Sequence, residues 1–180
     1  MPVTIRPAKD SDAPALGRMG AALARQHHGF DPPRFLLPDD VESGYRWWLG
    51  KEARRPQEAV VLVAELDGDV VGYCYGRLEG VDWNMLLDRH GALHDIWVEA
   101  RARGTGTGRL LAEAMVERLT ELGAPRVVLH TAAKNEAARR LFERLGWRPT
   151  MVEMTREAPR GAPPPRGDDE APGGGPQGPP

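Results

Sequence analysis

The residues whose types and spacing best suit chemistry are the run Arg103-Gly104-Thr105-Gly106-Thr107-Gly108. The run follows an apolar stretch typical of a strand and leads into the helical spacing of residues 106–122. A glycine turn between a strand and a helix brings unpaired backbone N–H groups and the positive end of the helix dipole to one point. Such a point suits a phosphate, because glycine lets the oxygens approach and adopts positive φ. Positive charge beside it would come from Arg101, Arg103 and Arg109.

Two familiar nucleotide-binding patterns do not fit this run. A P-loop has lysine directly after its last glycine, whereas Arg109 follows Gly108 here. The dinucleotide pattern G-x-G-x-x-G also fails, because position 109 is not glycine. Taken alone, the run therefore predicts either an anion site or a glycine-rich connector that only turns the chain.

The composition of the 180 residues restricts the classes of function. Lys plus Arg total 24 against 26 Asp plus Glu, and a net charge of -2 gives no general field for nucleic acid or an anionic membrane. The single cysteine, Cys74, excludes an internal disulfide framework and fits a reducing compartment. The sequence shows neither a long apolar run nor a charged leader followed by one. We therefore expect a cytoplasmic protein without nucleic-acid or membrane partners.

One folded domain is expected over residues 1–156, followed by a tail over residues 157–180. A chain of this length can bury one sizeable core but not two. The tail has almost no large apolar residue and is rich in Pro and Gly, so it cannot repay the entropy of ordering. We expect the tail to be disordered.

Alternating strand-like and helix-like periodicities predict an α/β (α+β) domain with the order β-α-α-β-β-β-α-β-α-β. Asp67-Gly68-Asp69 suits a tight hairpin between two of the strands. A first helix should begin near Pro14, and further helices are expected over residues 39–49, 106–122 and 135–145. Strands are expected near residues 3–6, 59–66, 70–76, 92–98, 126–131 and 147–156.

Two spaced motifs resemble those of the GNAT superfamily of N-acetyltransferases. The glycine run, after the strand Leu93-His94-Asp95-Ile96-Trp97-Val98, resembles the family's Arg/Gln-x-x-Gly-x-Gly/Ala motif. The segment from Asn135 to Trp147, NEAARRLFERLGW, is similar to the family's Asn-x-x-Ala-x-x-x-Tyr-x-x-x-Gly-Phe segment. The resemblance covers residues 3–156 and is clearest over residues 93–147.

The resemblance implies a GNAT-like fold, with a mixed, mainly antiparallel central sheet flanked by helices. It also implies an acetyl-CoA-dependent N-acetyltransferase in which a primary amine attacks directly in a ternary complex. The partners would be acetyl-CoA, as co-substrate, and an amine acceptor, either a small molecule or a peptide amine. Dimers are common in the family, so a homodimer is compatible with the resemblance.

The same resemblance implies which residues hold the coenzyme. The strand at 93–98 should splay from the strand at 126–131 and leave backbone near Ile96 free to pair with the pantetheine arm. The glycine turn would hold the pyrophosphate, and Asn135 and Phe142 would face the coenzyme from one side of a helix. The expected coenzyme-binding residues are Ile96, Trp97, Val98, Arg103, Gly104, Thr105, Gly106, Thr107, Gly108, Arg109, Asn135, Ala138 and Phe142.

Acetyl transfer to an amine needs a base, because an amine is mostly protonated at neutral pH. The candidate catalytic bases are His94 and Asp95, and many family members carry Glu where His94 aligns. Imidazole exchanges its proton near neutral pH, which suits that role. Strand alternation puts the two side chains on opposite faces unless a bulge intervenes, so we expect only one of them to line the acceptor side. A partly exposed strand residue without a catalytic role is the alternative for His94.

The sequence departs from the family at the residue that would protonate the leaving thiolate. The family often has a tyrosine there, whereas this chain has Phe142, which has no proton to give. Tyr73 or Tyr75 could substitute, water or the substrate ammonium could protonate the thiolate, or catalysis could be slow or absent. A thiolate with an ordinary pKa of about 8.5 is a tolerable leaving group, which favours reduced dependence on an acid. The alternative function is a non-catalytic module that senses acyl-CoA.

Other residues that could carry chemistry have simpler explanations. His27-His28 has no Cys, Asp or Glu partner at ligand spacing, so no metal site is expected. Cys74 in an apolar strand predicts a core residue. Trp47, Trp48 and Trp83 lie in segments that form the substrate wall in the family, with core packing expected for at least one of the first two. The acceptor itself has no recognisable code in the sequence.

Overall fold

The computed structural model describes residues 2–158. The chain divides into two units, Met1–Pro149 and Thr150–Pro180. The first unit contains every helix and strand of the described residues, together with all the site residues expected from the sequence. In the second unit, residues 150–158 are exposed and form neither helix nor strand.

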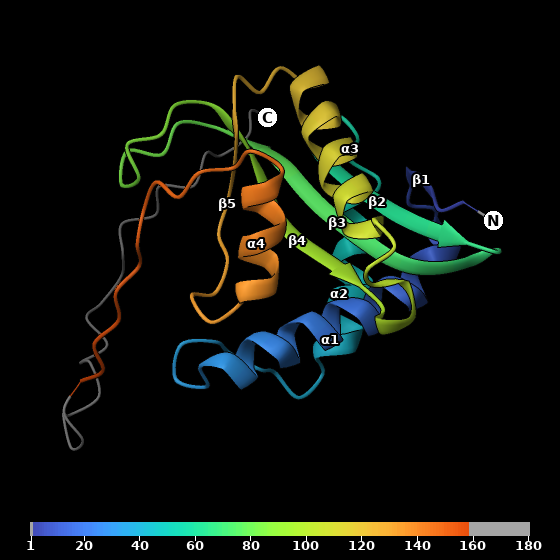
Figure 1. The fold of residues 1–180 in the computed structure, drawn as a ribbon, viewed down its shortest axis with the longest axis horizontal. Helices are drawn as coiled ribbons and strands as arrows, with labels where there is room; N and C mark the ends of the chain where they lie inside the picture. The colour runs from blue at the N-terminus through green and yellow to red at the C-terminus, as the bar shows by residue number, and fades with distance from the viewer. Residues whose placement is uncertain (1, 159–180) are drawn as a thin grey trace, which may run out of the picture. The chain divides into compact units, whose positions relative to one another are not determined.

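A five-stranded sheet forms the centre of the first unit, with the strand order β1-β2-β3-β4-β5 (Figure 1). Its strands are β1 (Thr4–Pro7), β2 (Ala59–Leu66), β3 (Asp69–Glu79), β4 (His90–Val98) and β5 (Val127–Leu129). Neighbouring strands pair antiparallel except β4 and β5, which are parallel. The expected mixed, mainly antiparallel sheet is confirmed.

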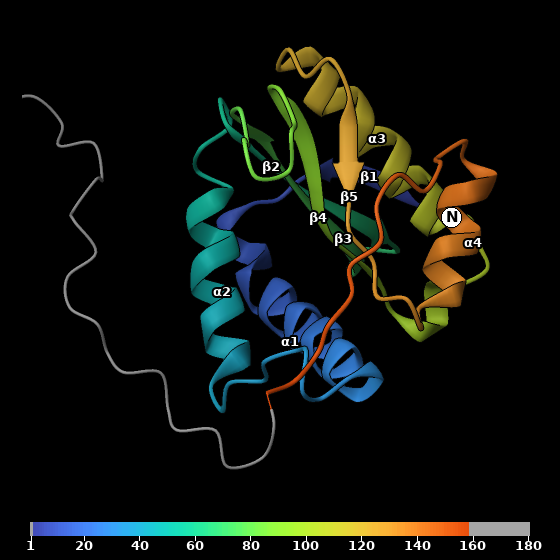
Figure 2. The same cartoon turned by 90° about the vertical axis from the view of Figure 1, so that its left-hand side faces the viewer.

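Helices cover both faces of this sheet (Figure 2). On one face, Leu16 of α1 and Leu49 of α2 pack in the same core as Tyr73 of β3. On the other, Met115 of α3 and Phe142 of α4 belong to a second core. The α-helices of this part of the chain are α1 (Ala13–Phe30), α2 (Val41–Glu52), α3 (Thr107–Glu121) and α4 (Glu136–Arg144).

Two local predictions about turns and helix starts are confirmed. Pro14 lies in the first turn of α1, where its missing N–H costs no helix hydrogen bond. Asp67 and Gly68 join β2 to β3 with φ of 53° and 86°, the positive values that a two-residue hairpin favours. Short 3-10 turns, Asp10–Asp12 and Ala100–Ala102, precede α1 and the glycine run.

The expected last strand over residues 147–156 is wrong. Residues 147–158 contain no strand, and Met151, Val152 and Met154 are 65%, 84% and 90% exposed. A strand needs a paired edge or a buried face; after Trp147, which packs against the core, residues 148–158 are exposed and pair with no strand. The tail that we expect to be disordered, residues 157–180, lies outside the described residues except for its first two, so the domain boundary at 156 stays a prediction.

Candidate active site

β4 and β5 pair over a short distance and then separate. Their register runs from Gly91 opposite Val127 to Leu93 opposite Leu129, where β5 ends. β4 continues to Val98 and stays paired with β3 on its other side. The edge of β4 beyond Leu93 is therefore open to an extended ligand that carries amides. This is the expected splay, with a β5 shorter than predicted.

The glycine run forms the turn between β4 and α3. The φ angle is 78° at Gly104 and 89° at Gly106, a region that other residues rarely adopt. A Cβ at either glycine would meet nothing within 4 Å, so the space outside the turn is open. Gly106 is the N-cap of α3, so the first helical N–H groups, which have no acceptor inside the helix, gather here. The turn therefore has the backbone that an anion site needs.

Gly108 has a different role from the first two glycines. A Cβ at this position would lie 3.3 Å from Cδ2 of Leu141 in α4 and 3.9 Å from Cγ2 of Val98. The absence of a side chain lets the first turn of α3 approach α4 closely. The third glycine of the run is thus explained by helix packing, a distinction that the motif alone does not make.

Two threonine side chains brace the turn. The Thr105 hydroxyl donates to the Ala102 carbonyl at 2.8 Å, and its oxygen lies 2.8 Å from the Thr107 hydroxyl. Because Thr105 uses its single proton on Ala102, Thr107 must donate to Thr105. Thr107 is 1% exposed. This bracing role is additional to the coenzyme contact expected of both residues.

The three arginines near the turn differ in how they are neutralised. Within residues 2–158, Arg103 forms no ion pair, whereas Arg101 and Arg109 are both paired. Their carboxylate partners are Asp69, Glu99 and Glu113. Arg103 donates from Nε to the Val98 carbonyl at 2.9 Å, and its guanidinium lies 4.8 Å from the centre of the Trp97 ring. Arg103 is thus the available positive charge beside the glycine turn.

Asn135 and Ala138 form the N-terminal cap of α4. The Asn135 side-chain oxygen accepts the backbone N–H of Ala138 at 3.2 Å. An asparagine cap satisfies one of the N–H groups left over at a helix start. The asparagine of the motif therefore has a structural reason in this chain, independent of any ligand.

Phe142 of α4 packs in the same core as Leu111 and Met115 of α3. Its side chain is 5% exposed, and its ring centre is 5.5 Å from that of Trp147. A tyrosine at this position would put a hydroxyl in a nearly dry environment. The observed surroundings are apolar, and contact with a coenzyme stays a prediction.

A bulge in β4 puts His94 and Asp95 on the same face of the sheet. The register steps from Tyr75 opposite Asp95 to Gly76 opposite Leu93, so His94 is the extra residue. Both side chains contact tyrosines of the face that α1 and α2 cover. The expected alternation of His94 and Asp95, with only one of them on this face, is wrong because the bulge interrupts it.

Asp95 is a partly buried carboxylate, and within residues 2–158 it has one side-chain hydrogen bond. Its Oδ2 accepts the Tyr73 hydroxyl at 3.0 Å. Burial raises the pKa of Asp95 from 3.8 to about 6, and the hydrogen bond from Tyr73 opposes part of that rise. At pH 7 the carboxylate is mostly ionised, yet it binds a proton more readily than an ordinary aspartate. These are the properties of a general base.

His94 lies at the exposed rim of the same face. Its ring stacks on Tyr75 with 5.4 Å between ring centres. Its Nε2 lies 3.3 Å from Oε1 of Glu79, and its side chain is 42% exposed. His94 therefore has direct access to solvent and a carboxylate partner of its own.

Tyr73 and Tyr75, the two alternative acids, both use their hydroxyl protons elsewhere. Tyr73 donates to Asp95, and Tyr75 donates to the buried carboxylate of Glu52 at 3.0 Å. Burial raises the pKa of each hydroxyl above the ordinary tyrosine value, so both hold their protons tightly. Sequence analysis missed the Tyr73–Asp95 pair. The two-residue spacing of the tyrosines indicated one shared face, but not which strand residue lay opposite.

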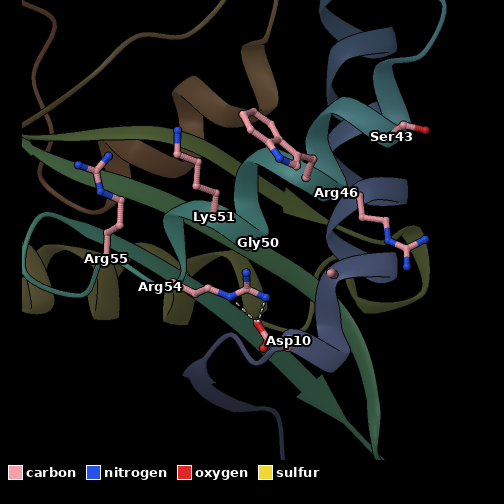
Figure 3. Close-up of a pocket in the computed structure, with 9 residues that line it drawn as sticks. Asp10, Ser43, Arg46, Gly50, Lys51, Arg54 and Arg55 are labelled. Carbon is pink, nitrogen blue, oxygen red and sulfur yellow. Dashed lines mark hydrogen bonds and ion pairs between the residues drawn. The ribbon is translucent and has the colours of Figure 1, made fainter.

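A shallow hollow on the outer side of α2 shares no residue with this site (Figure 3). It is lined by Asp10, Ala13, Ser43, Arg46, Trp47, Gly50, Lys51, Arg54 and Arg55. Much of its positive charge is already engaged: Arg54 pairs with Asp10 at 2.9 Å, and Lys51 lies 5.2 Å from the centre of the Trp47 ring. The carboxylate among the residues that line the hollow, Asp10, is exposed and paired with Arg54.

A model of the acetyltransferase (GNAT) family matches residues 22–147. The match includes the glycine turn, the bulged strand β4 and the segment that begins at Asn135. The chain belongs to the acetyltransferase (GNAT) family. This is the family that the two sequence motifs resemble.

Relatives of this GNAT protein include two curated acetyltransferases. The N-alpha-acetyltransferase of Sulfurisphaera tokodaii is 31% identical over 124 residues, which cover 66% of this chain and 72% of that relative. The mycothiol acetyltransferase of Sanguibacter keddieii is 32% identical over 101 residues, 56% of this chain, and the match spans 32% of that relative's length. The solved structure of AAC(6')-Iy in complex with a bisubstrate analogue, CoA-S-monomethyl-acetylneamine, shares the fold, with a TM-score of 0.65 and 18% identity over 88% of this chain and 99% of that one.

The histidines and the cysteine considered for metal or thiol chemistry have structural explanations. His27 and His28 each donate from Nδ1 to a backbone carbonyl. Cys74 is fully buried, as predicted for a core residue. In residues 2–158, no group of three or more His, Cys, Asp or Glu side chains could hold a metal ion. No helix in that range is both long and apolar enough to cross a membrane.

The tryptophans divide between packing and exposure. Trp48 packs on Tyr75 with 4.8 Å between ring centres, which confirms the core role expected for one of the adjacent pair. Trp47 and Trp83 are 68% and 81% exposed. Only Trp48 of the three is therefore placed on the face that carries His94 and Asp95.

Proposed function

We propose that the protein transfers an acetyl group from acetyl-CoA to a primary amine, by direct attack of the amine in a ternary complex. The observation that carries the proposal is the arrangement along β4. Beyond Leu93 this strand has an open backbone edge that leads into the glycine turn, and the same stretch presents Asp95 to the face of α1 and α2. One strand thus meets both requirements of the reaction, a place for the donor and a base for the acceptor.

The turn and the open edge fit the two ends of such a co-substrate. Gly104 and Gly106 leave open space over backbone N–H groups, where a pyrophosphate would meet the charge of Arg103. The edge from Ile96 to Val98 would pair with the amides of the pantetheine arm as a neighbouring strand would. Acetyl-CoA bound there supplies an acetyl thioester whose carbonyl carbon accepts the amine.

The base is assigned to Asp95 in preference to His94. Asp95 is partly buried, and its pKa of about 6 lets it take a proton at neutral pH. His94 is 42% exposed and already faces Glu79. In the transfer a C–N bond forms and the C–S bond breaks, while the proton of the amine passes to Asp95 directly or through one water.

The thiolate leaves without a proton from a protein acid and takes one from solvent. Phe142 has no proton to give, and Tyr73 and Tyr75 are engaged with carboxylates. A thiolate with a pKa of about 8.5 leaves readily enough for this route. The missing tyrosine is therefore compatible with catalysis.

The acceptor would bind against the face of α1 and α2, beside aromatic rings. Tyr45, Trp48 and Tyr75 form a continuous contact, with ring centres 5.7 Å and 4.8 Å apart. Aromatic rings attract cations, which suits an amine that arrives protonated. Of the two curated relatives, the N-alpha-acetyltransferase matches this chain over 72% of its own length, and the mycothiol acetyltransferase over 32%. We therefore propose the α-amine of a peptide as the first acceptor class to test.

Release of coenzyme A thiol tests the proposal, measured with acetyl-CoA and a panel of peptide α-amines, lysine side-chain amines, polyamines and amino sugars. The expected result is release that depends on the acceptor and saturates with it. Binding of acetyl-CoA without thiol release for any acceptor would favour the second function, a module that senses acyl-CoA. Phe142, which has no proton to give, is the observation that favours this alternative.

A further inference from the structure

The Tyr73 hydroxyl lies in a core whose other buried members, apart from Tyr75, are apolar. Tyr73 is 0% exposed and packs in one cluster with Leu16, Leu49 and Val63. A buried hydroxyl costs free energy unless it is hydrogen-bonded, and its partner here is Asp95 at 3.0 Å. A phenylalanine would fill the same core without that requirement, so the hydroxyl calls for a reason beyond packing.

We propose that Tyr73 is a positioning residue for acetyl transfer, which holds the Asp95 carboxylate in one orientation and stabilises its ionised form. This inference rests on the proposed function, in which Asp95 is the base. A hydroxyl that donates to a carboxylate makes a charge-assisted bond, and that bond favours the ionised state. Burial acts in the opposite sense and sets the pKa of Asp95 at about 6. Without the hydroxyl, burial would raise that pKa further.

The other titratable groups near Asp95 do not obscure its titration. Tyr45 of α2 and Cys74 of β3 feel the charge of Asp95, and burial raises the pKa of both well above neutral pH. In the described residues, α1 contributes no ion pair or hydrogen bond to Asp95. His94 is the neighbour in sequence, with Glu79 as its partner. A His94→Gln variant therefore separates the titration of the imidazole from that of the carboxylate.

Tyr75 gives a matched control for the loss of a hydroxyl. It lies two residues along the same strand, and its hydroxyl also donates at 3.0 Å to a buried carboxylate, that of Glu52. Tyr73→Phe and Tyr75→Phe each remove one such bond and keep the ring. Both variants should lose stability to a similar extent, whereas only Tyr73→Phe should alter Asp95.

The experiment compares kcat/KM against pH for the full-length wild type, Tyr73→Phe, Tyr75→Phe and His94→Gln. Tyr73→Phe should move the acid limb upward by about one pH unit, which is about a tenfold loss below pH 6 with activity retained at pH 9. In Tyr75→Phe and His94→Gln the midpoint of the acid limb should stay at the wild-type pH, whatever the level of kcat/KM. A uniform loss at all pH values in Tyr73→Phe, or an unmoved limb, would overturn the proposal.

A second measurement does not depend on turnover. The side-chain carboxyl signal of Asp95, assigned with Asp95→Asn and followed by NMR against pH, should titrate higher in Tyr73→Phe than in the wild type. An equal titration in the two proteins refutes the role of Tyr73, whatever the enzyme assays show. If the titration shifts as expected but Asp95→Asn keeps full turnover, the assignment of the base fails instead, and Tyr73 then positions a carboxylate that does no chemistry.

Discussion

The two sides of β4 are built by different means. On the side of the splayed edge, the features that suit acetyl-CoA are backbone features: two glycines with positive φ, a helix start and unpaired strand amides. On the side of α1 and α2, the features are side chains, namely Asp95, Tyr73 and His94, held by a bulge and by hydrogen bonds. The donor side therefore depends on chain conformation, and the acceptor side depends on contacts between strands.

We expect the two sides to tolerate substitutions differently. A backbone site is lost when a residue that must have positive φ gains a side chain, whereas most neighbouring side chains can vary. A side-chain site is lost through one carboxylate, even when the fold is unchanged. The donor chemistry can thus be common to a family while the acceptor chemistry differs from member to member.

A side chain at Gly106 should produce the largest effect on the donor side. Gly106→Ala puts a Cβ at φ 89°. We expect it to lower the free energy of unfolding by about 1–2 kcal/mol. We also expect it to raise the Kd for acetyl-CoA about 100-fold, equivalent to about 2.7 kcal/mol. Urea unfolding and calorimetric titration measure the two quantities.

Gly68→Ala is the matched control, because Gly68 has φ 86° in the hairpin between β2 and β3. It should lose similar stability and bind acetyl-CoA as the wild type does. An unchanged Kd in Gly106→Ala would show that the donor side does not depend on the backbone of this turn.

The pH dependence of stability tests the acceptor side. Because the pKa of Asp95 is raised from 3.8 to about 6, the folded state binds this proton more tightly than the unfolded state does. The contribution of Asp95 to stability is fully present below the unfolded pKa and is lost as pH rises through about 6. Asp95→Asn should therefore raise the free energy of unfolding by about 1–2 kcal/mol at pH 8, and the gain should vanish towards pH 4.

Urea unfolding at pH 4 and pH 8 makes the comparison, with the exposed Asp39 as a control position. Asp39→Asn should show no such gain. If Asp95→Asn were less stable than the wild type at pH 8, burial of the Asp95 charge would not lower the free energy of unfolding as we infer.

The cap of α4 separates structure from binding on the donor side. Asn135→Ala should lower the free energy of unfolding by about 1 kcal/mol, because Ala138 loses its acceptor. Asn135→Asp retains an acceptor oxygen and should recover most of that loss. The Kd for acetyl-CoA should change by less than about threefold in both. A rise as large as that of Gly106→Ala would show that Asn135 contacts the coenzyme directly.

The smallest effect is expected at Phe142. Phe142→Tyr restores the family's hydroxyl in a core position that is 5% exposed. We expect the rate of the chemical step in single-turnover experiments to change by less than about threefold, under about 0.7 kcal/mol of barrier. A tenfold increase would mean that the missing acid limits the enzyme.

The contrast between the two sides also explains what the sequence could predict. Gly104 and Gly106 report a local backbone requirement, so spacing alone predicts the turn and the helix after it. The coenzyme site at that turn came from the family resemblance and stays a prediction. Asp67-Gly68 is a local signal in the same way. The two motifs then identified the family, which supplied the splay of β4 from β5.

The acceptor side was less accessible to sequence analysis. The extra residue His94 is defined only by the register between Gly76 and Leu93, two positions in different strands. A partner such as Tyr73 for Asp95 depends on that same register. The strand wrongly expected over residues 147–156 has the same cause, because strand-like composition does not show whether an edge is there to pair with.

The most direct test of the account is Asp95→Asn, assayed for acetyl-CoA binding and for acceptor-dependent thiol release in the same preparation. We expect a Kd for acetyl-CoA within about twofold of the wild type, together with a loss of about 10²–10⁴-fold in kcat/KM for the amine. Full turnover in Asp95→Asn, or a loss of acetyl-CoA binding that matches the loss of turnover, would contradict the division of the two roles across β4.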